Sequence, residues 1–350
     1  MKRFFFLAVA ATAMLAACNK TEVVPTGDAQ EISFVAVNKV ATKAPVNGDT
    51  FLPGDNMDVV AYLAAGDGAT AGTYFTETLF TNVSGTNTWS GKRYWPLSDA
   101  TINFLAVTNT GGEVSGHVEN TFDSTIPASK VVSDLTGNDD VTQTDLMFAA
   151  GQGTHQQGAV YTTVGMVFKH ALSWINFKVR TGNGLTDADP KIAINSITLN
   201  NVPVNGTLTV TNGNYATTGG ECVTANLGAA WNFTDRADMK LIESGIVTDS
   251  YADELLLTAA YNEFGGNGVL VIPSAQTSFT INYTITQPDG TPNTFNYTYN
   301  LNDDWLMAKK YVYHITMTLT EILIEPSVAS WGEAIETFPS LDGQGDDEKK

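Results

Sequence analysis

The chain has 350 residues, of which 43% are hydrophobic and 16% are charged. Its 18 basic and 37 acidic side chains give a net charge of −19, which argues against a protein that tracks a nucleic-acid backbone or docks electrostatically on anionic lipid. The length suffices for about two domains, each with its own core.

Residues 1–17 have the pattern of an export signal, because Lys2 and Arg3 precede a continuous apolar run. The sequence LAAC at residues 15–18 is typical of a bacterial lipobox, in which Cys18 is lipidated and becomes the first residue. An ordinary signal peptide is the alternative, and Cys18 directly after small residues favours the lipoprotein. Without residues 1–17 the net charge is 16 − 37 = −21. Residues 18–30 are polar and predict a tether between lipid and first strand.

Most of the remaining chain has the pattern of β-strands. Segments rich in Val, Ile, Thr, Tyr and Phe recur between Gly, Asn, Asp and Pro. In residues 279–285 the odd positions are apolar or aromatic and the even positions polar, a period typical of antiparallel sheets with one buried face. The predicted strands are residues 32–37, 57–63, 102–107, 161–168, 172–179, 193–199, 206–210, 255–261, 268–273, 279–286, 293–300, 311–319 and 322–327.

Turns and two short helices complete the predicted elements. The sequence QPDG at residues 287–290 predicts a hairpin turn, and the Asn-Gly pairs at 205–206 and 212–213 bracket a short strand. Residues 303–310 predict one helical turn, because acidic residues at its start and Lys at its end suit the helix dipole. Residues 235–241 are a weaker helix candidate.

The polar, glycine-rich residues 151–158 predict a domain boundary. The expected organisation is therefore all-β, with an N-terminal β-sandwich domain over residues 31–158 and a C-terminal one over residues 159–338. Residues 339–350 are charged and turn-rich, and we expect them to form a flexible tail.

A search for chemistry predicts no catalytic residue, no metal site and no cofactor. Cys222 is the only thiol besides Cys18, so neither a disulfide within the chain nor a Cys/His zinc site is expected. No two histidines stand at metal-ligand spacing, and His170 and His314 fall in strand patterns that indicate structural imidazoles. The acidic residues 134–140 lack the ligand spacing of an EF-hand and predict a solvated loop.

The closely spaced aromatic residues Trp89, Tyr94 and Trp95 allow two interpretations. An exposed platform of these rings would stack on a sugar. Alternation and the following Pro96 suit a strand end that packs its ring into a core, and we favour that interpretation.

A set of short motifs, in this order and spacing, resembles the Bacteroidetes fimbrillin family of pilin-like lipoproteins over nearly the whole chain. The motifs are the lipobox Cys18, EISF at 31–34, ATKAP at 41–45, FLPGD at 51–55, KRYWP at 92–96, DLMFA at 145–149, VFKHAL at 167–172, INF at 175–177, and Trp305, KYVY at 310–313 and Trp331.

The resemblance implies two tandem transthyretin-like antiparallel β-sandwich domains in an exported outer-membrane lipoprotein of the cell surface or fimbrium. In polymerising members a protease removes the first strand, and a strand of another subunit fills the groove that opens. Applied to this sequence, the removable strand presents Ile32, Phe34 and Ala36. The donor strand is expected among Ile322, Ile324 and Val328, or in residues 334–338.

One feature departs from the best-known members, which are cut after arginine. No arginine lies between Cys18 and Arg93. Lys39 and Lys43 are therefore the expected maturation sites; without cleavage the protein would stay anchored by its lipid.

The leading hypothesis is a fimbrial structural subunit, or an accessory or anchor protein, that assembles by donor-strand exchange, supports adhesion and is not an enzyme. Its expected partners are other fimbrial subunits, the outer membrane through the lipid on Cys18, and an adhesion receptor on host or bacterium. The alternative is a surface glycan-binding β-sandwich lipoprotein that uses Trp89 or Trp95. A secreted hydrolase has the least support, because no nucleophile or acid pair stands out.

Overall fold

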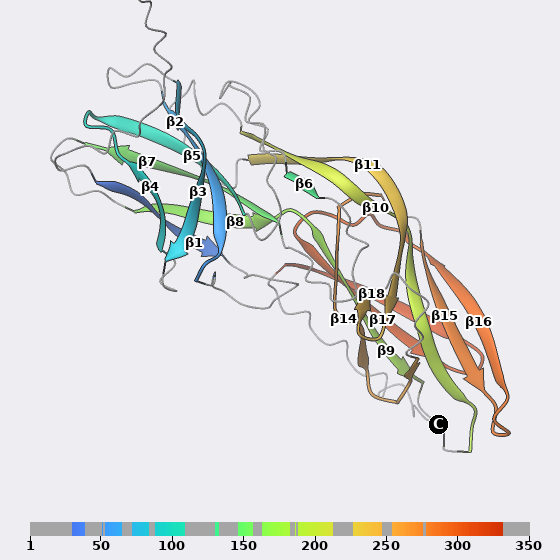
Figure 1. The fold of residues 1–350 in the computed structure, drawn as a ribbon. Coiled ribbons are helices and arrows are strands. Elements are labelled where there is room, and N and C mark those ends of the chain that lie inside the picture. The colour runs from blue at the N-terminus through green and yellow to red at the C-terminus, as the bar shows by residue number, and fades with distance from the viewer. Residues whose placement is uncertain are drawn as a thin grey trace, which may run out of the picture.

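The computed structural model describes residues 30–38, 51, 53–64, 72–83, 88–108, 130–132, 146–156, 163–182, 186, 188–212, 227–246, 254–275 and 278–331. Within these ranges the chain forms 18 strands and no helix, which confirms the all-β prediction. Two β units lie end to end, the first drawn in blue to green and the second in green to red (Figure 1).

The first unit is a closed barrel of seven strands in the order β1-β4-β3-β2-β5-β7-β8. Its interior is filled by aromatic and aliphatic side chains, among them Phe34, Phe80, Trp89 and Phe104, all fully buried. The strands are β1 (Glu31–Asn38), β2 (Asn56–Leu63), β3 (Gly72–Val83), β4 (Thr88–Tyr94), β5 (Ala100–Thr108), β7 (Met147–His155) and β8 (Val164–His170).

The barrel differs from the antiparallel sandwich that was expected for this part of the chain. Strand β1 pairs antiparallel with β4 and parallel with β8, so it joins the two ends of the sheet and leaves no free edge. Because β8 belongs to the barrel, the unit extends to His170, and the boundary predicted between residues 158 and 159 falls inside it.

The second unit is a sandwich of two sheets that share one apolar core. One sheet has the order β12-β11-β10-β15-β16, with β6 and β13 paired to β10; the other has the order β14-β9-β17-β18, in which β9 and β17 are parallel. The strands are β6 (Lys130–Val132), β9 (Ser173–Thr181), β10 (Lys191–Asn212), β11 (Leu227–Ile242), β12 (Gly245–Ile246), β13 (Leu255–Leu256), β14 (Asn262–Val271), β15 (Ser278–Thr286), β16 (Pro292–Asn300), β17 (Lys309–Met317) and β18 (Ile322–Ser330).

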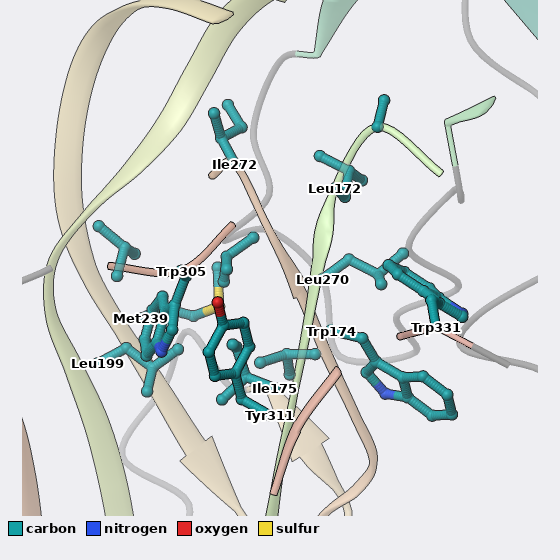
Figure 2. Close-up of a cluster of buried hydrophobic side chains, with 14 of the residues drawn as sticks. Leu172, Trp174, Ile175, Leu199, Met239, Leu270, Ile272, Trp305, Tyr311 and Trp331 are labelled. Atoms are coloured by element: carbon teal, nitrogen blue, oxygen red, sulfur yellow. The ribbon is translucent and has the colours of Figure 1, made fainter. Parts of the chain in front are cut away.

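The helical turn predicted for residues 303–310 is wrong, because this segment closes the core of the sandwich. The Trp305 indole is buried beside Met239 and Tyr311, as Figure 2 shows, and its Nε1 donates to the Tyr313 hydroxyl at 2.8 Å. The Tyr311 hydroxyl accepts from Leu306 N at 2.8 Å and donates to the carbonyl of Asp304 at 3.0 Å. The backbone of the segment is therefore satisfied by side chains and by the backbone of neighbouring segments, such as the Leu172 carbonyl that accepts from Ala308 N at 3.0 Å.

Pairing between strands also changes three other local predictions. Residues 235–241 lie in β11, where pairing with β10 outweighs a weak helix propensity. The short strand expected between the two Asn-Gly pairs is part of the longer β10, and the pair at 205–206 makes a shift of register inside it, with no chain reversal. Of the strand predicted for residues 255–261, only Leu255 and Leu256 pair. The hairpin turn at residues 287–290 is confirmed, with Gly290 N donating to the Gln287 carbonyl at 2.9 Å.

The two units are joined by an apolar cluster on the outside of the barrel, separate from the cluster in its interior. Val60, Leu105 and Phe148 point out of β2, β5 and β7 and belong to the same core cluster as Leu208 and Leu227 from β10 and β11. Strand β5 is buried on both faces as a result, which removes the polar alternation of a half-exposed strand. Strand β6, which follows β5 in the chain, also pairs with β10.

The glycine-rich stretch that predicted a domain boundary, residues 151–158, begins inside strand β7. A Cβ on Gly153 would run into the Trp95 ring and come within 2.9 Å of Val164 Cγ2, and one on Gly151 would lie 2.8 Å from the Gly165 carbonyl oxygen. The glycines thus allow neighbouring atoms to approach the strand closely.

Gly153→Ala should destabilise the barrel by about 1–3 kcal/mol, because the added methyl group overpacks the Trp95 ring. The matched control is Gly165→Ala on β8, where a new Cβ has nothing within 4 Å; it should change the unfolding free energy by less than about 1 kcal/mol. Urea unfolding of both variants measures the difference, and equal effects would contradict this account of β7.

Candidate functional site

The candidate site is strand β1 and the two strands that flank it. Phe34 stands opposite Trp89 on β4 and opposite Val164 on β8, and the parallel ladder with β8 continues from there to the pair Asn38 and Phe168. β1 is therefore an interior strand of the barrel, and its removal would leave one edge of β4 and one edge of β8 unpaired.

Alternate side chains of β1 enter the barrel core. Ile32, Phe34 and Ala36 are all fully buried, while Ser33 and Val35 between them are only half-buried. The Phe34 ring meets its neighbours edge to face, with centroids 4.9 Å from Phe80 and 5.0 Å from Phe104. Each such aromatic pair stabilises the fold by about 0.5–1.5 kcal/mol beyond the free energy gained from burying apolar surface.

Polar contacts hold the start of β1 against β4. The carboxylate of Glu31 accepts a hydrogen bond from the Ser90 hydroxyl and one of 3.1 Å from Lys92 N. The Gln30 carbonyl accepts from Trp95 N at 3.0 Å. Lys92 has a positive φ of 53°, which turns the β4 backbone at this contact. These contacts set the register in which the three apolar side chains enter the core.

A half-buried tyrosine, Tyr74, lies in β3 next to β4. The Tyr74 hydroxyl donates to the Tyr94 carbonyl at 2.7 Å, at the end of β4. Burial raises the pKa of Tyr74, and the positive charge of Arg93 offsets part of that rise. The phenol thus stays neutral at physiological pH and serves as a hydrogen-bond donor.

The residues expected to anchor and mature the chain lie outside the described residues. These are Cys18, Lys39 and Lys43. The other cysteine, Cys222, for which no site was predicted, lies outside them as well. β1 ends at Asn38, so Lys39 is the residue directly after the strand.

The expected donor residues are found in β18, an edge strand that pairs with β17 over all nine of its residues. Ile322 and Ile324 are half-buried and pack against the sandwich core, whereas Val328 is 53% exposed. All three face the core side, because their partners Met317, Ile315 and Tyr311 do. The other expected donor, residues 334–338, is outside the described ranges.

Two features of β18 concern its free edge and its outer face. Thr318 N donates to the Glu321 carbonyl at 2.8 Å, and the alternation of an antiparallel ladder then directs the ring nitrogen of Pro326 to the free edge. Glu325 stands opposite His314 on the outer face. Burial lowers the pKa of His314, as does nearby Lys178, while hydrogen bonding and charge from Glu325 raise it.

The aromatic residues Trp89 and Trp95 form part of the barrel core, with exposures of 0% and 4%. Phe51 meets the Trp89 ring edge to face at 5.0 Å, and His155 stacks near Trp95 at 6.3 Å. The core interpretation is thus confirmed, and the glycan-binding alternative loses the platform on which it was based.

Two kinds of feature are absent from the described ranges. They contain no group of three or more His, Cys, Asp or Glu side chains that could hold a metal ion. They also contain no helix with the length and apolarity to cross a bilayer.

The sequence patterns did not predict most of the surroundings of β1. Neither β3 nor β4 was predicted as a strand, and the partners Phe80 and Phe104 come from β3 and β5. A usable signal was the motif KRYWP at residues 92–96, which begins in β4 and continues past its end.

Phe34→Ala should destabilise the barrel by about 3–5 kcal/mol, because it empties the centre of a well-packed core. Val35→Ala, on the opposite face of the same strand, should cost about 1 kcal/mol or less. Hydrogen exchange of the β4 and β8 amides reports the local opening: protection should fall sharply for Phe34→Ala and little for Val35→Ala. Similar protection in both variants would mean that β1 does not hold the barrel closed.

Comparison with known proteins gives one family and several solved structures. A model of fimbrillin-like proteins matches residues 42–331, and no curated protein gives a significant match. A cell adhesion protein from Bacteroides uniformis is 18% identical with a TM-score of 0.49, the alignment covering 86% of this chain and 99% of that one. A fimbrial protein from Bacteroides vulgatus is 13% identical with a TM-score of 0.47, covering 85% and 99%. The fimbrial anchor protein Mfa2 from Porphyromonas gingivalis is 11% identical with a TM-score of 0.35, covering 87% and 98%.

Proposed function

The chain belongs to the fimbrillin-like family, and we propose that it is a cell-surface fimbrial subunit, or an anchor or accessory protein, that assembles by donor-strand exchange and supports adhesion. In this proposal Cys18 carries the lipid that holds the chain in the outer membrane until it is cleaved after Lys39 or Lys43. The proposal takes the two units as the transthyretin-like domains that the resemblance implies, the first of them closed into a barrel by β1. The partners are other fimbrial subunits and an adhesion receptor, with no cofactor or catalysed reaction.

The observation that carries the proposal is the place of β1 between β4 and β8. Loss of this strand would expose two unpaired rows of backbone groups and the pockets of Ile32, Phe34 and Ala36 at once. An apolar groove flanked by two open ladders is a strong binding site for an incoming strand. Because β4 and β8 run in opposite directions, a strand of either direction would make one parallel and one antiparallel ladder.

The alternation of β18 supports its candidacy as the donor. Ile322, Ile324, Pro326 and Val328 follow one another at every second position, which is the spacing of the pockets left by β1. Its departure from β17 would uncover Ile315 and Met317, and filling a neighbour's groove has to offset that cost.

Assembly can be tested by cutting the chain in vitro. A specific protease site placed at residues 39–43 should convert the purified chain from monomers into SDS-resistant ladders after cleavage, because β1 is then free to leave. A synthetic peptide of residues 31–38 should block the ladders, and the same peptide with Phe34→Glu should not. Monomers that persist after β1 has been displaced would contradict strand exchange.

The donor strand is tested by two neighbouring substitutions in β18. Ile324→Asp, on the core side, should abolish polymerisation of the cleaved chain, whereas Leu323→Asp, on the outer face, should leave it intact. Cleaved Ile324→Asp chains should still accept wild-type donors and cap wild-type ladders. Normal polymerisation of Ile324→Asp would exclude β18 and leave residues 334–338 as the candidate.

The N-terminal residue of the protein taken from cells tests maturation. A lipidated Cys18 would identify an anchored subunit, and a start at Val40 or Ala44 would identify a processed one. Mass spectrometry of surface-shaved and membrane fractions distinguishes the two. A start beyond residue 51 would contradict cleavage at Lys39 or Lys43.

A further inference from the structure

In the described part of the chain the two strand paths of the sandwich end in β12, β16, β14 and β18, and three of these four strands resist pairing with another chain. β12 has only two residues, and β14 is distorted by Gly265, Gly266 and Gly268, all with positive φ. β18 carries Pro326, whose nitrogen faces its free edge and offers no donor there. Short length, irregular backbone and proline are the usual protections of sheet edges.

The fourth edge strand, β16, has none of these protections along its length. It pairs with β15 over nine residues without any shift of register, and proline occurs only at its first position. Its sequence PNTFNYTYN holds no charged residue in a chain with a net charge of −19. Within the described part of the chain, β15 is its only neighbour in the sheet.

The pairing phase of the hairpin shows which backbone groups of β16 are free. Gln287 N donates to the Thr291 carbonyl at 2.9 Å. Counting from that pair, Phe295 and Tyr297 hydrogen-bond to β15, while the backbone groups of Thr294, Asn296 and Thr298 point to the free edge.

The two aromatic side chains are on the core side of the sheet, yet Phe295 is 43% exposed and Tyr297 is 36% exposed. Phe295 stacks on Tyr283 at 5.5 Å, and Tyr297 stands opposite the buried Ile281. Their exposure arises because β16 is the last strand of its sheet, and one further strand would cover them.

We infer that the free edge of β16 pairs antiparallel with β16 of a second copy of this chain, with Asn296 on the two-fold axis. In that register the free backbone groups match: Asn296 faces Asn296, and Thr294 faces Thr298. Phe295 of one copy then stands beside Tyr297 of the other, so that each covers part of the exposed ring of its partner. Cross-strand aromatic pairs and threonine pairs are both favourable in sheets.

The outer face of the hairpin supports the same register. Rows of like side chains already cross it: Asn195 Nδ2 donates to Asn282 at 2.7 Å, and Asn282 Nδ2 donates to Asn296 at 2.7 Å. The hydroxyls of Thr284 and Thr294 lie 3.1 Å apart, as do those of Thr280 and Thr298. The two-fold register continues the asparagine row as Asn296 to Asn296 and joins the two threonine rows as Thr294 to Thr298.

Charge also favours a second copy at this edge over the others. Two chains of net charge −19 repel each other, and the cost is least where the facing strands are neutral. β15 and β16 together carry no charged side chain, so pairing here brings no like charges into direct opposition.

Disulfide trapping tests the pairing and its register on the full chain with Cys18 and Cys222 replaced by serine. Asn296→Cys should give a disulfide-linked dimer, because the two Cα atoms would lie about 5.5 Å apart. Thr294→Cys and Thr298→Cys should not cross-link alone, since each would lie about 13 Å from its own copy. A mixture of the two should cross-link.

A charge substitution tests the interface without cysteine chemistry. Asn296→Lys places two lysines face to face and should weaken the dimer at least tenfold in sedimentation equilibrium. Asn282→Lys removes the same Asn282–Asn296 hydrogen bond, but its two copies would lie about 14 Å apart, so it should dimerise as the wild type does. Circular dichroism verifies that both variants fold.

The inference is overturned if the wild-type chain is monomeric up to about 100 μM, or if Asn296→Cys and Thr294→Cys cross-link equally. It does not depend on strand exchange, because β1 is in the barrel and remains intact in these measurements. A dimer that survives Asn296→Lys unchanged would place the contact elsewhere and equally refute it.

Discussion

Strand β1 hydrogen-bonds to β4 on one side and to β8 on the other, and this double pairing turns seven strands into a closed barrel. Closure is the only arrangement that leaves a sheet without an edge. The closure depends on eight residues, because the loss of β1 would break both of its hydrogen-bonded ladders and expose the pockets that its side chains fill.

The barrel and the sandwich are coupled through the long ribbon of β10 and β11. Its far half packs on the outer face of β2, β5 and β7, so the barrel wall has one apolar cluster inside and another outside. Trp231 Nε1 donates to the Ala171 carbonyl at 2.8 Å, at the crossing between the units. Nearby, Trp331 stacks on His170 with ring centroids 4.0 Å apart. The residue that follows β18 thus contacts the last residue of β8, so this stacking links the end of the sandwich strand to the end of the barrel strand.

The edge strands β16 and β18 differ in how well their free backbone groups can pair with another strand. Pro326 removes one backbone donor from the free edge of β18, so this strand resists lateral pairing there, and as a donor strand it would lack one hydrogen bond on that edge. β16 is regular, neutral and aromatic, and offers its backbone without interruption. Exchange through β1 and lateral contact through β16 would use opposite units of the chain, so a subunit has surfaces for two independent directions of contact.

Alternation of side chains determined the all-β class, most strand positions and the inward face of Ile32, Phe34 and Ala36, because burial of one sheet face imposes a period of two on the sequence itself. The tertiary structure alone decided that β1 has two neighbours, since pairing partners distant in sequence leave no local pattern. It also decided that the glycines at 151 and 153 lie in strand β7, where the missing side chains leave room for the Trp95 ring and for β8. It likewise decided that Trp305 packs into the sandwich core where a helical turn was expected. In each of these places a long-range contact outweighs local propensity, because one buried aromatic ring contributes more free energy than a few residues of helix or turn preference.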